Sequence, residues 1–223
     1  MTGSLTNPST QQLQAALTRH HVTLADQFLP PLCRYCELLW DWNARINLTR
    51  HTSFDDFVTR DVIDSLRLSS HIPDGQTVLD VGSGGGVPGI ILAVTRPTLT
   101  VSLAESVGKK ARALTDITRR MKLALPVHAA RAEDVLKQQR FDVLTVRAVA
   151  PLRKLLFWFQ RRTSRFDQLL LIKGPRWVAE REEAAAEGLL DRASVQVVDQ
   201  YATPGHDHES VILSVRFSAD AAD

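Results

Sequence analysis

The sequence has few of the features that mark secreted or membrane-spanning proteins. Only two of its 223 residues are cysteines, so a disulfide framework is excluded and a reducing cytoplasm is the expected location. No apolar run approaches the ~20 residues that a membrane helix needs, and the polar stretch from Met1 to Gln14 has no signal-peptide pattern. The remaining composition, 44% hydrophobic and 23% charged, is typical of a globular chain.

Metal-binding patterns are also missing. Cys33-x-x-Cys36 lies within a predicted helix and has no second cysteine pair. The segment His206-Asp207-His208 has no further ligands nearby in the sequence. Because a zinc site needs several ligands at suitable spacing, we expect no metal.

Positive charge is concentrated in the middle of the chain. Of 27 Lys and Arg residues, 18 lie between Val107 and Arg181, where only 6 of the 25 Asp and Glu residues lie. A basic face commonly binds a phosphate-rich partner, which indicates nucleic acid. The alternative at this point is that these charges lie on solvent-exposed helix faces and bind no partner.

The first 72 residues are predicted to form a helical cap. The spacing of apolar residues predicts helices over Gln11–His20 and Leu24–Ile46. Pro30 and Pro31 are expected to kink or divide the second helix, because proline lacks an N–H group and clashes with the preceding turn. A third helix is predicted over about Ser53–Ser70, with its first residue as the N-cap.

From residue 73 onward, short apolar strands alternate with helices. This alternation is typical of a parallel sheet covered on both faces, and it predicts a doubly wound, Rossmann-like α/β domain over residues 73–217, followed by a tail at 218–223. The predicted parallel strands are Thr77–Val81, Thr100–Ala104, Val127–Ala130, Val143–Val146 and Leu169–Ile172, and the predicted helices are Gly89–Thr95, Lys109–Leu123, Glu133–Gln139, Leu152–Arg162 and Arg176–Gly188. Two final strands, Val195–Tyr201 and Ser210–Phe217, are expected to close the sheet as an antiparallel pair.

A glycine-rich segment follows the first predicted strand and opens the next helix. In a doubly wound fold a nucleotide binds at this position, and glycines let the backbone approach it closely. Gly84-x-Gly86-x-x-Gly89 matches the dinucleotide fingerprint, whereas Gly82-x-Gly84-x-Gly86 matches the methyltransferase form of the loop. Either match alone is weak, so NAD(P) and S-adenosylmethionine are both candidates.

Two acidic residues favour S-adenosylmethionine. Asp80 lies two residues before the first glycine, where a carboxylate would repel a pyrophosphate but attract the ammonium and sulfonium groups of S-adenosylmethionine. Glu105 ends the second strand and is a candidate acceptor for ribose hydroxyls. An alternative for Asp80 is that it only caps the turn. The predicted donor-binding residues are Asp80, Gly82, Ser83, Gly84, Gly86, Glu105, Ala132 and Glu133, the last of which would equally suit a helix N-terminus.

Arg147 and Lys173 are the predicted catalytic residues. They end the fourth and fifth strands, where doubly wound enzymes place their reactive groups. Arg147 is suited to pair with a substrate phosphate or carbonyl and is counted with the cofactor contacts as well. The alternatives are an internal ion pair for Arg147 and a surface position for Lys173.

Two sequence features are absent, and their absence limits which atom can accept the methyl group. No Asp/Asn-Pro-Pro-Tyr/Phe segment follows the fourth strand, so there is no grip for an exocyclic amine. No cysteine lies near a strand end, so covalent attack on a pyrimidine ring is not expected. A ring nitrogen with a free lone pair needs neither device, only alignment with the methyl group.

Several short motifs occur together in a characteristic order. They are Trp42-Asn43, Asn47-Leu48-Thr49, Arg60 with Ile63-Asp64-Ser65, the Asp80–Gly89 loop, Glu105-Ser106 with Gly108-Lys109-Lys110, Arg147-Ala148 and Leu171-Ile172-Lys173-Gly174. With this combination, about Leu38 to Val215 resembles the ribosomal RNA small subunit methyltransferase G family, also called glucose-inhibited division protein B. The resemblance implies a guanine-N7 methyltransferase acting on 16S ribosomal RNA. It places Asp80, Gly82, Gly84 and Glu105 at the donor and Arg147 and Lys173 at the substrate. We expect a monomer that meets this RNA within the small ribosomal subunit.

The sequence departs from this family at two positions. Asp61 stands where the family usually has histidine, and Glu209 stands where it often has arginine. If these positions touch RNA phosphate, an acid there is expected to weaken RNA binding.

RNA is expected to contact the basic helix after the second strand. The residues predicted to do so are Lys109, Lys110, Arg112, Arg119 and Arg120. Two alternatives to an RNA methyltransferase stay open. One is an NAD(P)-dependent oxidoreductase, and the other is a non-catalytic RNA-binding protein with a degenerate methyltransferase fold.

Overall fold

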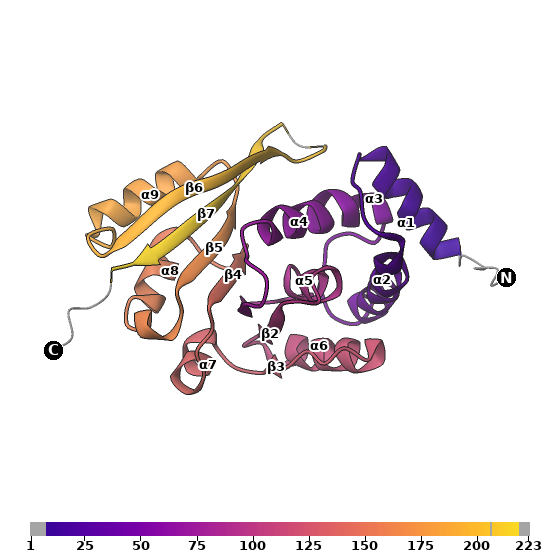
Figure 1. Ribbon diagram of the computed structural model, residues 1–223, viewed down its shortest axis with the longest axis horizontal. Coiled ribbons are helices and arrows are strands. Elements are labelled where there is room, and N and C mark those ends of the chain that lie inside the picture. Colours follow the sequence, from indigo (N-terminus) through magenta and orange to yellow (C-terminus); the bar gives the residue numbers. More distant parts are fainter. Residues whose placement is uncertain (1–7, 206, 219–223) are drawn as a thin grey trace.

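One mixed sheet organises the protein (Figure 1). Within residues 8–205 and 207–218, which the computed structural model describes, the strands are β1 (Thr77–Val81), β2 (Thr100–Ala104), β3 (Val127–His128), β4 (Val143–Arg147), β5 (Gln168–Lys173), β6 (Ala193–Ala202) and β7 (Glu209–Phe217). Their order in the sheet is β3-β2-β1-β4-β5-β7-β6. The first five are parallel, and β7 pairs antiparallel with both β5 and β6. This confirms the predicted doubly wound α/β fold with an antiparallel C-terminal edge.

Helices cover both faces of the sheet. On one face lie α4 (Ile63–Ser69), α5 (Gly89–Thr95) and α6 (Gly108–Met121), and on the other lie α7 (Ala132–Gln138), α8 (Leu152–Phe159) and α9 (Trp177–Ala186). Successive residues of a strand therefore enter different cores: Val78 packs in the first and Leu79 in the second. Burial on both faces explains why the strands are apolar throughout.

The N-terminal helices extend one of these cores. They are α1 (Pro8–Arg19), α2 (Leu29–Asn43) and α3 (Phe54–Phe57), with a short 3-10 helix at Asp26–Phe28 before α2. Buried Leu13, Tyr35 and Phe57 belong to the same cluster as Val78 and Ile90. The cap therefore shares a hydrophobic core with the sheet, and the predicted boundary after residue 72 marks a change of secondary structure within that core.

Two expectations about these helices are tested by the structure. At Pro30 and Pro31 the predicted helix is divided and not kinked: a 3-10 helix at Asp26–Phe28 precedes α2, and both prolines lie in the first turn of α2, where an N–H group has no intrahelical partner to lose. Ser53 is confirmed as an N-cap, since its Oγ accepts from the backbone N–H of Asp56 at 3.1 Å. The helix that it starts is not uniform, because a π-helical turn over Val58–Val62 joins α3 to α4.

One strand is shorter than expected. The predicted strand Val127–Ala130 is β3, which ends at His128. It lies at the edge of the sheet and pairs only with Leu103 and Ala104 at the end of β2, so the pairing stops where β2 stops. Among the described residues, no helix has the length and apolar character needed to span a bilayer.

Candidate active site

The glycine loop leaves β1 in a shape that side chains would prevent. The backbone N–H groups of Gly82 and Ser83 both donate to the carbonyl of Ala104, at 2.8 and 3.1 Å, which ties the loop to β2. Gly86 has φ +108°, and a Cβ there would lie 2.5 Å from the Cδ1 atom of Ile90. A side chain at this position would therefore distort the turn that starts α5.

Asp80 lies beneath the loop and is 1% exposed. Its two carboxylate oxygens accept from the hydroxyl of Thr145 at 3.0 Å and from the backbone N–H of Gly89 at 3.2 Å. Burial raises the pKa of Asp80 to about 6, although these hydrogen bonds oppose the change. Asp80 therefore holds the turn, which is the alternative that the sequence left open. Because the carboxylate lies beneath the loop, it can attract a bound donor only across the loop backbone.

Glu105 is also buried, at 5% exposure, and braces the loop from the end of β2. Its carboxylate accepts from the backbone N–H of Gly84 at 2.9 Å and from that of Val107 at 2.7 Å. Each oxygen keeps a second lone pair, so the carboxylate can still accept a hydroxyl from a ligand. Ser83, by contrast, uses its hydroxyl to donate to the backbone carbonyl of Asp80 at 2.9 Å.

The cap helix α2 supports the loop from the other side. The buried Tyr35 hydroxyl donates to the carbonyl of Gly85 at 2.9 Å. A Cβ on Gly85 would lie 3.2 Å from the Cδ1 atom of Leu39 and 3.3 Å from the carbonyl of Leu48. Trp42 donates to Asp116 at 2.9 Å, which fixes α2 against α6. The N-terminal helices are therefore part of the scaffold of this site.

A pocket of about 190 Å³ opens beside the loop. We call it the glycine-loop pocket; its lining includes Gly82, Ala104, Ala132, Glu133 and Trp158. It is smaller than the roughly 300–1,000 Å³ of pockets that bury a whole ligand, so it would enclose only part of a nucleoside-sized molecule. Of the predicted donor residues, it brings together Gly82, Ala132 and Glu133, while the buried acids lie under the loop.

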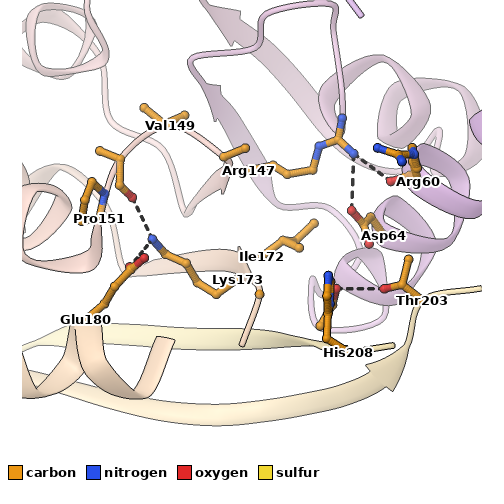
Figure 2. Close-up of a pocket in the computed structure, with 14 residues that line it drawn as sticks. Arg60, Asp64, Arg147, Val149, Pro151, Ile172, Lys173, Glu180, Thr203 and His208 are labelled. Carbon is orange, nitrogen blue, oxygen red and sulfur yellow. Dashed lines mark hydrogen bonds and ion pairs between the residues drawn. The ribbon is translucent and has the colours of Figure 1, made fainter. Parts of the chain in front are cut away.

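A second pocket, of about 520 Å³, lies across the ends of β4 and β5 (Figure 2). We call it the arginine pocket; it is lined by Arg60, Asp64, Arg147, Lys173 and Glu180 among others. Val149 lines both pockets, and a Cβ on Gly82 would lie 2.7 Å from its Cγ2 atom. The two pockets are thus neighbours at the carboxyl edge of the sheet, with Val149 between them.

Arg147 is held by acids inside the protein. Its Nη1 atom lies 2.8 Å from Asp61, 3.4 Å from Asp64 and 2.8 Å from the backbone carbonyl of Arg60. Tyr201 donates to the other oxygen of Asp64 at 2.7 Å. The internal ion pair that the sequence left as an alternative is therefore present, and it exists together with a place in the pocket wall.

The pKa values of Asp61 and Asp64 are shifted in opposite directions. Burial alone would raise the pKa of Asp61, but Arg147 and His51 outweigh burial and hold it below its ordinary value. For Asp64 burial dominates, and its pKa is raised although Arg147 and Tyr201 oppose this. The difference follows from contact, because Asp61 lies closer to Arg147 and also pairs with His51 at 3.0 Å.

The departure at Asp61 has a structural explanation. Asp61 is 2% exposed and faces inward from the π-helical turn. It therefore does not lie where it would touch RNA phosphate, and the expectation that it weakens RNA binding is wrong. Glu209 is exposed at the start of β7 and hydrogen-bonds with Gln200, so its effect on RNA stays a prediction.

Lys173 is neither a free cation nor a surface residue. Its side chain is 11% exposed, and Nζ donates to Glu180 and to the backbone carbonyl of Ala150, each at 2.7 Å. Figure 2 shows it on the opposite side of the pocket from Arg147. Glu180 also accepts from the backbone N–H of Leu152 at 2.8 Å, so it links the end of β5 to the start of α8.

The predicted RNA-binding residues on α6 fall into two groups. Arg119 pairs with Asp116 at 2.6 Å, and Arg120 lies 3.6 Å from Asp116 and 3.7 Å from Asp41. The remaining three, Lys109, Lys110 and Arg112, have no ion-pair partner in the part of the chain that the structure describes. These three lie towards the end of α6 that follows Glu105.

The described residues contain no cluster of three or more potential metal ligands. His206 lies outside them. Cys33 and Cys36 are free thiols buried in α2.

Comparison with known proteins identifies the family. The sequence model of the family described as GidB, rRNA small subunit methyltransferase G, matches residues 29–209. The chain is 47% identical over 190 residues to ribosomal RNA small subunit methyltransferase G of Rhodopirellula baltica, which covers 85% of this chain and 82% of the relative. It is 36% identical over 195 residues to the same-named protein of Solibacter usitatus, covering 86% and 91%. The chain belongs to the rRNA small subunit methyltransferase G family.

Solved structures agree on the fold. The structure of TrmK from M. capricolum in complex with S-adenosyl-homocysteine has a TM-score of 0.54 at 10% identity and covers 71% of each chain. The ribosomal protein L11 methylase from Lactobacillus delbrueckii subsp. bulgaricus has a TM-score of 0.51 at 15% identity, covering 70% of this chain and 77% of that one. The predictions of a class I methyltransferase fold, of an S-adenosylmethionine-dependent rRNA methyltransferase and of its cofactor are therefore confirmed.

Sequence reasoning missed several residues that shape the site. Val149 between the pockets, Trp158 in the glycine-loop pocket and Tyr201 on Asp64 carry no motif. Glu180 and His51 pair with Lys173 and Asp61 across turns of the fold. None of these pairings has a signature in local sequence, because the spacing between the partners is set by how the elements pack.

Proposed function

We propose that the protein transfers a methyl group from S-adenosylmethionine to N7 of a guanine in 16S ribosomal RNA. The observation that carries this proposal is the pair of neighbouring pockets at one edge of the sheet, with Val149 between them. The glycine-loop pocket suits the donor and the arginine pocket suits the base. Methyl transfer needs these two ligands in line across a short gap.

The residues around the glycine loop fit the donor. Bound S-adenosylmethionine supplies the electrophilic methyl group. Asp80 and Glu105 place two carboxyl groups under the loop, which suits a ligand with an ammonium and a sulfonium better than one with a pyrophosphate. Glu105 positions the loop through Gly84 and offers its remaining lone pairs to hydroxyls. Trp158 and Ala132 provide apolar surface for a base.

The charges around the arginine pocket balance one another. Arg60, Arg147 and Lys173 line it together with Asp64 and Glu180, and buried Asp61 pairs with Arg147 from behind the wall. Attack by N7 transfers positive charge from sulfur to the guanine ring, and these carboxylates keep that charge from facing unopposed cations. N7 has an unprotonated lone pair, and no residue needs to act as a general base.

Arg147 is suited to positioning the substrate. Its pairs with Asp61, Asp64 and the carbonyl of Arg60 all use Nη1. The Nε and Nη2 groups are left to donate to a phosphate or to O6 of the guanine. Since the acids fix the guanidinium from behind, little side-chain freedom is lost when the substrate binds.

The RNA context follows from the accessibility of N7. In helical RNA this edge of guanine lies in a deep, narrow groove that side chains do not enter. We therefore propose a guanine in a loop or one that is extruded from its stack, within the small ribosomal subunit. We further propose that the enzyme acts as a monomer in the cytoplasm.

The test is methyl transfer followed by chemical mapping. Labelled S-adenosylmethionine and the protein are added to small ribosomal subunits from a strain lacking this enzyme, and the product RNA is treated with borohydride and then aniline, which break the chain at 7-methylguanosine. We expect one new break at a guanine of 16S RNA. A methylated product without a break at any guanine would refute the N7 assignment.

Calorimetry distinguishes the methyltransferase from an NAD(P)-dependent oxidoreductase. We expect heat of binding with S-adenosylhomocysteine and none with NAD. Binding of S-adenosylhomocysteine without any methyl transfer to subunits or to bare 16S RNA would favour the non-catalytic RNA-binding protein.

A further inference from the structure

An aromatic side chain stands in solvent beside the proposed site. Phe157 on α8 is 62% exposed. The helix already has a complete apolar face, since Leu152, Leu155, Leu156 and Phe159 are fully buried. Phe157 is not part of this core, and most of its ring gains no free energy from burial. Its position therefore calls for an explanation outside the fold.

Two cations lie near the ring in the sequence. Lys154 precedes Phe157 by three residues within α8, which is the spacing of neighbours on a helix surface, and Arg161 follows it by four, in the turn just after α8 ends at Phe159. Both are exposed, and neither side chain has an ion-pair partner among the residues that the structure describes. On α6, by contrast, Arg119 and Arg120 are offset by acids. We call Lys154, Phe157 and Arg161 the α8 face.

α8 itself lies beside both pockets. The helix begins directly after Pro151, which lines the arginine pocket, and Trp158 next to Phe157 lines the glycine-loop pocket. Exposed Arg131, at the start of α7, also lines the glycine-loop pocket. Figure 1 shows α7, α8 and α9 together on one side of the sheet, away from the N-terminal helices. A strand of RNA that enters the arginine pocket would therefore leave close to α8.

We propose that the α8 face binds an unpaired stretch of RNA beside the target guanine, with one base stacked on Phe157 and the phosphates on either side contacting Lys154 and Arg161. This rests on the proposed function, to which it adds a docking surface. A ring flanked by unpaired cations is how proteins bind single-stranded nucleic acid. A second copy of this chain fits less well, because two such faces would bring like charges together.

Binding is measured with bare 16S RNA that lacks the modification, in the presence of S-adenosylhomocysteine. We expect Phe157→Ala to weaken binding about 10-fold, as loss of one stacked base does. Phe157→Tyr should bind like the wild type, whereas Phe157→Leu, which is apolar without a ring, should be as weak as alanine. Unfolding and S-adenosylhomocysteine affinity should not change.

The cations are tested by salt dependence. Lys154→Ala with Arg161→Ala should lower the slope of log affinity against log salt by about 1.4, from two lost phosphate contacts on a single strand. Arg34→Ala with Arg45→Ala removes the same charge from α2 and the turn that follows it, where both arginines are ion-paired, and should leave the slope unchanged.

Three outcomes would overturn the assignment. They are wild-type affinity in Phe157→Ala, full affinity in Phe157→Leu, and a wild-type dimer in sedimentation that Phe157→Ala dissociates. Because binding and methyl transfer are measured separately, a wild type that transfers no methyl refutes the proposed function, whereas altered binding curves still support the surface. A wild type that methylates while all α8 variants bind normally refutes the surface alone.

Discussion

Replacing Arg147 by alanine removes the charge that offsets two carboxylates inside the protein. The side chain of Asp61 is 3% exposed and that of Asp64 is 13% exposed, so neither regains full hydration in the folded state. Removing one partner of a fully buried pair costs about 3–5 kcal/mol. Because the Arg147 side chain is itself 24% exposed, we expect the free energy of unfolding to fall by about 2–4 kcal/mol.

Companion variants separate charge from geometry. Arg147→Lys keeps the positive charge but loses the planar fork, so we expect a smaller loss of stability together with a large loss of methyl transfer. Arg147→Ala combined with Asp61→Asn removes a carboxylate along with the cation. We expect this double variant to be more stable than Arg147→Ala, which would measure the coupling between the two side chains.

The assay is urea unfolding followed by circular dichroism at several pH values. In the wild type, Arg147 and His51 hold the pKa of Asp61 below its ordinary value against the effect of burial, so its stabilisation is present above that ordinary value and is lost as pH falls through the lowered one. Without Arg147, burial raises the pKa of Asp61, and the defect should be largest at pH 7 and shrink towards pH 4. A loss within the roughly 0.5 kcal/mol of surface substitutions, or one independent of pH, would refute this reasoning.

Three further predictions concern the donor site and α6. In Glu105→Gln a single acceptor oxygen is left for two backbone N–H groups. We expect this variant to bind S-adenosylhomocysteine about 1–3 kcal/mol more weakly in calorimetry. Unchanged affinity would remove Glu105 from the donor site. Burial raises the pKa of Asp80 to about 6, so between pH 4 and pH 6 the folded protein holds a proton that the unfolded chain releases. Over this range the wild type should lose up to about 3 kcal/mol of stability relative to Asp80→Asn. Parallel pH profiles of stability for the two proteins would contradict this. Lys109→Ala with Lys110→Ala should reduce the salt slope of RNA binding more than loss of the paired arginines of α6 does, and equal slopes would mean that pairing does not decide the RNA contacts.

The sequence alone determined the sheet, the glycine loop and the edge at which the site forms. Strand and helix patterns repeat locally, and in a parallel sheet the carboxyl ends of the strands meet at one edge. Glu105, Arg147 and Lys173 could thus be assigned to that edge from their places after β2, β4 and β5. The motifs also identified the family, since their order along the chain needs no knowledge of packing.

Only the tertiary structure decided the charge state of the site and its division into two pockets. Asp61 and Asp64 offset Arg147 from a helix more than 80 positions away in the sequence, and Glu180 reaches Lys173 because α9 folds back over the end of β5. The burial that raises the pKa of Asp80 comes from the loop closing over it. Such pairings depend on which faces of distant elements pack together, and the local alternation of apolar and polar residues carries no information about the depth at which a charged group will lie.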